Sequence, residues 1–288
     1  MRSIVRTQMK TSDNILLWLK IIRPQTLAAS ICPVLVGFIT GGVGKPAVAA
    51  TTLLCALFLQ ILSNLINDYY DFKRGTDKKG RAGFRRALAE GLVTERQMLS
   101  ACFISLAASI ITGLFLVISG GWPILAIGAT AILFAWLYTA TDHSLSYLGI
   151  ADIFVFLYYG VIATMGTEYL QTGVWASQAF WAGGACGLIS MCVLITNNLR
   201  DIESDRAAGK KTFPVRFGKK AGEAGYLAVI LLIPLFDYMA FGLCPAMLTV
   251  IPGTALFFKV LHSEGAQYNL CLMLAGALNI THTILCLL

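Results

Sequence analysis

The stretch Asn64-Leu65-Ile66-Asn67-Asp68-Tyr69-Tyr70-Asp71 closes a long apolar run that begins near residue 46. A second stretch, Asn197-Asn198-Leu199-Arg200-Asp201-Ile202-Glu203-Ser204-Asp205, closes another apolar run further along the chain. Loops rich in Lys and Arg follow both stretches. Because carboxylates at the edge of a bilayer are costly, their repeated occurrence in this setting indicates a function.

The composition is that of an integral membrane protein. Of the 288 residues, 57% are hydrophobic and 13% are charged, and the mean hydropathy is +0.73. A soluble protein carries a charged fraction of about 25%. The net charge of +7 is concentrated in a few loops, which suggests topology and anion binding and argues against a nucleic-acid partner.

Apolar runs long enough to cross a bilayer recur along the whole chain. We expect nine, near residues 15–42, 46–70, 96–119, 122–140, 147–166, 175–199, 221–241, 243–262 and 266–287. The first contains Lys20, Arg23 and Pro24, so it is expected to be an amphipathic lead-in followed by a span. The pattern predicts an all-α transmembrane bundle of about nine helices. It forms one domain over residues 1–288, with similar halves at about 15–140 and 147–288.

Positive charge marks alternate connections. The N-terminus and the loops after the second and sixth runs are basic, whereas the loops after the first, third, fifth and seventh carry almost no Lys or Arg. Basic loops stay on the cytoplasmic side of a membrane. We therefore expect a multi-pass protein of a bacterial inner membrane, with the N-terminus and both acidic stretches on the cytoplasmic side and the C-terminus outside.

The two acidic stretches form an internal repeat. Asn197 and Asp201 each lie 133 residues after their counterparts, Asn64 and Asp68. The second and sixth spans run in the same direction, so the repeat is parallel. Two similar halves would bring both stretches to one mouth of the bundle.

Spacing also predicts the chemistry. Side chains three or four residues apart share one helix face, which groups Asn64, Asp68 and Asp71 in the first stretch and Asn197, Asp201 and Asp205 in the second. Four carboxylates at helix C-termini repel one another and are disfavoured by the helix dipoles. One or two Mg²⁺ ions would remove this conflict and bind phosphate oxygens as well; Mn²⁺ would suit the same ligands. The neighbouring Lys and Arg fit a phosphate, although topology alone explains any single one.

The remaining polar residues give weaker signals. The eight cysteines lie in or beside apolar runs without a metal-ligand spacing, so we interpret them as small packing residues, and the three histidines form no metal constellation. Asp237 and His282 are interpreted as structural. For Asp152, a functional role and an interhelical hydrogen bond both remain open.

These residues resemble a known family. The segments Asn67–Asp77 and Asn197–Thr212 are similar to the UbiA superfamily of intramembrane aromatic prenyltransferases, and most of all to the 1,4-dihydroxy-2-naphthoate prenyltransferases of menaquinone synthesis. Arg23-Pro24-x-Thr26 and Gly149-x-x-Asp152 extend the resemblance over nearly the whole chain. The 4-hydroxybenzoate enzymes usually have a third Asp four residues after the second; this chain has Gly75 there.

The resemblance implies a reaction and a site. A polyprenyl diphosphate and a dihydroxynaphthoate-like acceptor would react with loss of CO₂, giving demethylmenaquinol. The metal ligands would be Asp68, Asp71, Asp201 and Asp205, with Asn64, Asn67, Asn197 and Asn198 contributing to the metal shell and phosphate. The diphosphate would be held by Arg23, Lys73, Arg81, Arg200, Lys210 and Lys211. The allylic cation would be stabilised by Tyr69, Tyr138 and Tyr158.

Two departures concern the aromatic acceptor. Phe84 stands where Pro is common, and the loop of residues 139–146 has Asp142 and His143 where Pro and basic residues are frequent. Prenylation of 1,4-dihydroxy-6-naphthoate or 4-hydroxybenzoate therefore remains an alternative. A cation or phosphate transporter is the alternative of another class, but transporters place such residues near mid-membrane on broken helices.

Overall fold

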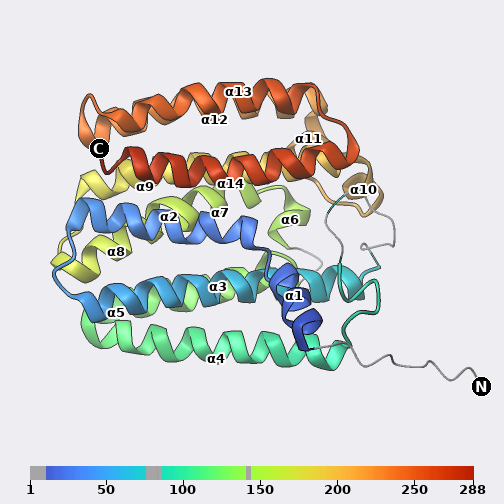
Figure 1. Cartoon of the computed structure of the whole chain (residues 1–288), viewed down its shortest axis with the longest axis horizontal. Coiled ribbons are helices and arrows are strands. Elements are labelled where there is room, and N and C mark those ends of the chain that lie inside the picture. The colour runs from blue at the N-terminus through green and yellow to red at the C-terminus, as the bar shows by residue number, and fades with distance from the viewer. Residues whose placement is uncertain (1–10, 76–82, 84–85, 141–143) are drawn as a thin grey trace, which may run out of the picture.

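The computed structural model describes residues 11–75, 83, 86–140 and 144–288, and throughout this part of the chain the regular elements are helices. Figure 1 shows the long helices lying side by side, with their connections gathered at the two ends of the bundle. The all-α transmembrane bundle expected from the sequence is confirmed.

Within the described residues, seven helical segments are long and apolar enough to cross a membrane: α2 (Pro24–Gly41), α3 (Pro46–Lys73), α4 (Glu95–Gly120), Ala151–Thr172, α9 (Ser177–Arg200), α12 (Lys219–Phe241) and Gly265–Leu285. Two shorter apolar segments, α5 (Trp122–Leu137) and Pro245–Leu261, complete the nine expected from hydropathy. Apolar side chains face outward, as they do in lipid: on α4, Phe103 is 71% exposed and Ile118 is 86% exposed.

Three of these segments are composite. Ala151–Thr172 joins α7 (Ala151–Phe156), the π-helical turn η1 (Leu157–Val161) and α8 (Ile162–Thr172). Pro245–Leu261 joins the 3₁₀ turn η2 (Pro245–Thr249) to α13 (Val250–Leu261), and Gly265–Leu285 joins η3 (Gly265–Gln267) to α14 (Tyr268–Leu285). The short helices α6 (Leu145–Leu148), α10 (Ile202–Ala207) and α11 (Phe213–Phe217) lie in the connections.

The expected lead-in is a separate helix, α1 (Thr11–Ile21), which lies across the ends of the long helices (Figure 1). The chain turns at Arg23, whose φ of 56° is in the left-handed region that side chains rarely adopt. Pro24 then begins α2, at a position where its missing N–H is not needed. Such strain in a non-glycine residue often marks a functional position.

Helix α9 is the most buried of the long segments, and small residues let its neighbours approach closely. A Cβ at Gly160 of η1 would lie 2.4 Å from the carbonyl oxygen of Gly183 and 2.5 Å from the Cα of Gly187. A Cβ at Gly187 would lie 2.5 Å from the carbonyl oxygen of Phe156. The backbones of α9 and η1 are therefore in direct contact.

Helices α3 and α9 end at the same end of the bundle, beside α1, α10 and α11 (Figure 1). One local expectation is wrong: Asn197, Asp201 and Asp205 do not share one continuous helix, because α9 ends at Arg200 and α10 begins at Ile202. Backbone bonds from the N–H of Asp201 to Asn197 and from the N–H of Asp205 to Asp201, of 3.1 and 2.8 Å, nevertheless keep a nearly helical path.

Candidate active site

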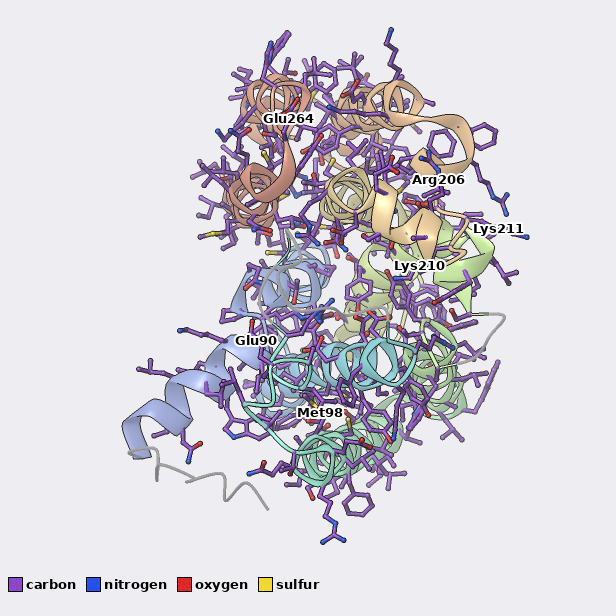
Figure 2. The ribbon with its side chains drawn as sticks, turned by 90° about the vertical axis from the view of Figure 1, so that its right-hand side faces the viewer. Glu90, Met98, Arg206, Lys210, Lys211 and Glu264 are labelled. Carbon is purple, nitrogen blue, oxygen red and sulfur yellow. The ribbon has the colours of Figure 1, made fainter. Side chains whose placement is uncertain are left out.

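A cavity of about 570 Å³ runs into the bundle from the end where α3 and α9 finish. Both acidic stretches line its mouth, through Asn64, Asn67, Asp71, Asn197, Asn198, Asp201 and Asp205. Figure 2 views the molecule from this end, with Lys210 toward the middle and Arg206 and Lys211 nearer the outer edge. The structure thus brings together two stretches that are 133 residues apart in the sequence.

Asp68 is buried and holds two guanidinium groups. Arg23, at the strained turn before α2, and Arg86, beyond the first acidic stretch, both donate to its Oδ1. Arg86 also approaches the Oδ1 of Asn67, at 3.5 Å. Asp68 itself is not among the residues that line the cavity, whereas Arg23 and Arg86 are. Its carboxylate therefore orients two cations that face the cavity.

Asp201 has its own guanidinium partner. Arg200 donates from Nε and Nη2 to the two oxygens of Asp201, at 2.9 and 2.7 Å. The same side chain donates from Nη2 to the side chain of Asn197, and from Nη1 to the Oδ1 of Asn269 on α14, at 2.9 Å. The bidentate geometry is the strongest type of ion pair available to a carboxylate, and it fixes the end of α9 against α14.

Lys210 connects the two acidic stretches. Its Nζ lies 3.9 Å from Oδ1 of Asp71 and 3.4 Å from Oδ1 of Asp205, and it lies over the ring of Tyr147, 5.9 Å from the centroid. Burial raises the pKa of Asp205, and Lys210 only partly offsets this. Burial lowers the pKa of Lys210, but Asp71 and Asp205 outweigh it, so the pKa lies above its ordinary value and the ammonium stays charged.

The two asparagines of the first stretch have structural partners. Asn64 donates to the carbonyl of Ile22 and to the hydroxyl of Thr26, both at 3.0 Å, and so ties α3 to the turn between α1 and α2. Asn67 donates to the hydroxyl of Thr139 at 3.0 Å. Asn64 therefore holds the strained turn that presents Arg23 to Asp68.

The structure places the other predicted phosphate-binding residues differently. Lys73 is half exposed and pairs with Glu95 at 2.6 Å, away from the cavity lining. Lys211 is exposed and also lies outside the lining, with its backbone N–H bonded to the carbonyl of Tyr147 at 3.1 Å. Arg81 lies outside the described residues, as do Asp77, Phe84, Asp142 and His143. Among the described residues, the cations that line the cavity are Arg23, Arg86, Arg200 and Lys210.

Arg86 is the main residue that sequence reasoning did not select. It is one of many cations in the loop after α3, and nothing in its spacing separates it from Arg85. Only the path of the chain shows that its side chain returns to Asp68. Its place in the basic loop that follows the first acidic stretch was the available signal.

Beyond the polar mouth the cavity becomes apolar. It continues between α4, α5 and α8 along Leu114, Val117, Ile127, Ile132 and Leu170. Tyr138 and Tyr158 line it, as expected for groups that could face a cation. Tyr69 does not: its ring packs edge-on against Tyr70, with the centroids 5.3 Å apart. The cavity thus suits a molecule with a charged head and a long hydrocarbon tail.

The donor set at the mouth fits a hard divalent cation. Four carboxylates and several amide oxygens gather there, and Mg²⁺ prefers oxygen ligands of this kind. The position of Lys210, whose ammonium lies near Asp71 and Asp205 together, shows that a cation between the two stretches is favoured. Asp71, Asp201 and Asp205 line the cavity and can reach such an ion, whereas Asp68 is covered by two arginines.

A membrane-spanning helical bundle with paired acidic stretches at the mouth of an apolar cavity defines the class of intramembrane prenyltransferases. The chain belongs to the UbiA prenyltransferase family, whose model matches residues 30–269.

Curated relatives and solved structures agree with this assignment. The chain is 37% identical to the 1,4-dihydroxy-2-naphthoate octaprenyltransferase of Escherichia coli K12, over 70% of this chain and 68% of that protein. It is 31% identical to the enzyme of the same name from Haemophilus influenzae, over 84% and 82% of the two chains. A UbiA homolog from Archaeoglobus fulgidus bound to DMAPP and Mg²⁺ has the same fold, with a TM-score of 0.66 at 17% identity over 93% of this chain and 99% of that one. A homolog from Aeropyrum pernix K1 gives 0.70 at 15% identity, over 91% and 98%.

Proposed function

We propose that this protein transfers a polyprenyl group from a polyprenyl diphosphate to 1,4-dihydroxy-2-naphthoate, with loss of CO₂, to give demethylmenaquinol in menaquinone biosynthesis. Two relatives that are 37% and 31% identical to this chain over the aligned residues are named 1,4-dihydroxy-2-naphthoate octaprenyltransferase, which supports the donor and acceptor classes. The observation that carries the proposal is the cavity itself, which is acidic and basic at its mouth and apolar along its length.

The mouth carries acidic and basic side chains in equal number, which can bind a metal ion and a diphosphate respectively. Four carboxylates, Asp68, Asp71, Asp201 and Asp205, face four cations, Arg23, Arg86, Arg200 and Lys210. Mg²⁺ held by Asp71, Asp201 and Asp205 would neutralise the diphosphate as it leaves. Once the ion engages Asp71 and Asp205, the ammonium of Lys210 is available to the phosphate oxygens. The guanidinium groups of Arg23 and Arg86, which Asp68 holds at the cavity, are available as well. Asn67 and Asn197 accept hydrogen bonds from Arg86 and Arg200 and help to orient these cations.

The apolar part of the cavity has two tasks. It holds the prenyl tail, and it excludes water from the allylic centre, where water would compete with the aromatic ring for the cation. Tyr138 and Tyr158 line this region and present π faces that stabilise positive charge. We place the mouth on the cytoplasmic side of a bacterial inner membrane, because the basic loops adjoin it.

The test is an assay with membranes, Mg²⁺, octaprenyl diphosphate and 1,4-dihydroxy-2-naphthoate, in which the product is identified by mass. We expect a prenylated, decarboxylated naphthoquinol that disappears with EDTA. Asp71→Asn and Asp205→Asn should each lower kcat/KM by about a hundredfold or more, since each removes a charge that the metal ion requires. The matched control is Glu203→Gln: Glu203 lies in the same stretch but is exposed and pairs with Arg206 at 2.9 Å.

Three outcomes would count against parts of the proposal. Turnover with 4-hydroxybenzoate or 1,4-dihydroxy-6-naphthoate in place of 1,4-dihydroxy-2-naphthoate would change the acceptor. Equal losses in Glu203→Gln and Asp71→Asn would contradict the metal assignment. Absence of diphosphate release with all three aromatics, together with Mg²⁺ or phosphate uptake into vesicles, would favour the transporter alternative.

A further inference from the structure

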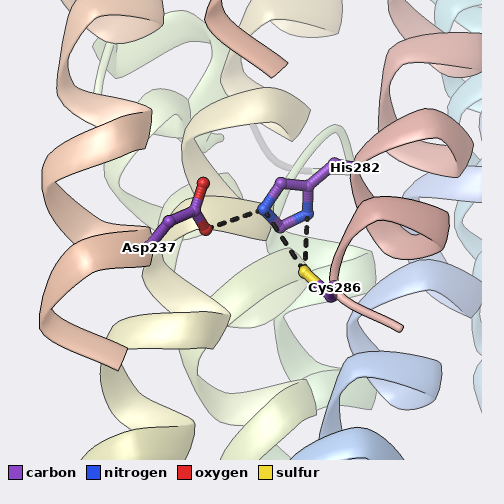
Figure 3. A group of neighbouring side chains, drawn as sticks. All are labelled: Asp237, His282 and Cys286. Carbon is purple, nitrogen blue, oxygen red and sulfur yellow. Dashed lines mark hydrogen bonds and ion pairs between the residues drawn. The ribbon is translucent and has the colours of Figure 1, made fainter. Parts of the chain in front are cut away.

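A second cluster of ligand-type side chains lies at the opposite end of the bundle. Asp237 is near the end of α12, and His282 and Cys286 are at the end of α14 (Figure 3). Asp237 comes 18 residues after Lys219, where α12 begins beside the active-site end, and at 1.5 Å per residue this is about 27 Å. The cluster is therefore separate from the acidic stretches.

The three side chains are buried together. Asp237 and His282 have no exposed surface, and Cys286 is partly covered. The Nε2 of His282 lies 2.9 Å from Oδ1 of Asp237, and the Sγ of Cys286 lies 3.7 Å from the same nitrogen and 3.8 Å from Nδ1. One ligand atom from each residue lies within 4.8 Å of the other two. A second thiol, Cys186 of α9, has its Sγ 4.0 Å from the Nδ1 of His282.

The carboxylate has an unsatisfied atom. The Oδ2 of Asp237 is buried and makes no hydrogen bond within the described part of the chain. A buried carboxylate is costly unless it is paired or coordinates a metal ion, and His282 satisfies only one of its oxygens. The carboxylate therefore keeps acceptor capacity for a cation.

We propose that Asp237, His282 and Cys286 form a Zn²⁺ site. Carboxylate, imidazole and thiolate are all zinc ligands. Bonds of about 2.0–2.3 Å in a tetrahedron place ligand atoms roughly 3.3–3.8 Å apart. The sulfur–nitrogen distances of 3.7 and 3.8 Å between Cys286 and His282 already fit this range. The 2.9 Å hydrogen bond between His282 and Asp237 is shorter, and the two side chains must separate slightly when the ion replaces it.

The combined charge of the ligands also fits Zn²⁺. Binding releases the thiol proton of Cys286 to solvent, and the resulting thiolate together with the Asp237 carboxylate balances the charge of Zn²⁺. A neutral assembly suits an apolar environment far better than a lone carboxylate does. The ion joins α14 to α12, so it acts as a structural clamp on the C-terminal helix.

The experiment uses the full chain in detergent, stripped with EDTA and reloaded with Zn²⁺ or Co²⁺ in the presence of excess Mg²⁺. We expect about one bound Zn²⁺ per chain, a melting temperature that rises by several degrees on loading, and a thiolate-to-cobalt charge-transfer band. The acidic stretches offer oxygen ligands, so Co²⁺ bound there gives no such band. Prenyl transfer with Mg²⁺ is a separate readout, so failure of the site and failure of the proposed function are distinguishable.

The Cys286→Ala variant should lose the band and the thermal shift. The matched control is Cys102→Ala, which removes another buried thiol, on α4, and should keep both. Absence of the band in the wild-type chain would overturn the proposal whether or not the variant folds. So would a band that survives in Cys286→Ala, or a thiol titration in which two cysteines are lost to a disulfide without metal.

Discussion

Arg86 and Lys73 show how two cations near one acidic stretch can have different roles. Arg86 donates to Asp68 and faces the cavity, whereas Lys73 pairs with Glu95 at a half-exposed position. A surface ion pair contributes about 0–1 kcal/mol, while a hydrogen bond to a charged group contributes about 1.5–3 kcal/mol. The family resemblance suggested Lys73 as a phosphate-binding residue, but the geometry favours Arg86.

We expect Arg86→Ala to raise the KM for the prenyl diphosphate by about 10- to 100-fold, because the diphosphate loses a charged hydrogen bond. Asp68 keeps its partner Arg23 in this variant, so the protein should still fold. Lys73→Ala is the control and should change KM less than about twofold. The KM values of the two purified variants are compared by steady-state kinetics. A larger rise in KM for Lys73→Ala than for Arg86→Ala would mean that Lys73, and not Arg86, binds the diphosphate.

At the scale of elements, the contact between α9 and η1 packs the helix that carries the second acidic stretch against the rest of the bundle. Gly160 and Gly183 allow two backbones to touch, and α9 carries Asn197, Asn198 and Arg200 at its end. A change in this packing would displace the second acidic stretch as well as loosen the bundle.

Gly160→Ala should therefore lower the melting temperature markedly, because its Cβ would meet backbone atoms at 2.4 and 2.5 Å that cannot move aside. The cost is about 1–3 kcal/mol or more. Gly225→Ala on α12 is the control: its Cβ would meet only the ring of Phe213, at an ordinary 3.7 Å, and helix propensity favours Ala by about 0.5–1 kcal/mol. Thermal unfolding in detergent should separate the two, and equal melting temperatures would refute the packing argument.

For the whole molecule, the charge pattern predicts a single orientation. The segment from α10 to the first turn of α12, at the acidic end, carries basic residues such as Lys211, Arg216, Lys219 and Lys220. The C-terminus lies at the opposite end of the bundle (Figure 1). If basic loops face the cytoplasm, the C-terminus lies outside.

Fusion of alkaline phosphatase after Leu288 should therefore give an active reporter, and a fluorescent protein at the same point should stay dark. Fusions within the connection near Gly209 should give the reverse pattern, because that connection adjoins the basic end. Fluorescence from the C-terminal fusion would mean that the orientation, and with it the proposed cytoplasmic side of the active site, is wrong.

Much of the protein follows from the sequence alone. Hydropathy located the nine apolar segments, the charge pattern predicted their orientation, and the offset of 133 residues predicted that the two acidic stretches would meet. These features can be predicted from the sequence because span length and helical spacing are local properties of the chain. The break at Asp201 was missed, since no Gly or Pro marks it.

Only the tertiary structure decided which side chains meet. It joined Lys210 to both Asp71 and Asp205, and returned Arg86 to Asp68. It also assembled Asp237, His282 and Cys286, although the sequence had been interpreted as lacking any metal constellation of cysteine and histidine. His282 follows Asp237 by 45 residues on another helix, so no spacing rule connects them. Such contacts depend on how helices pack and rotate against one another, and that information is distributed over the whole chain.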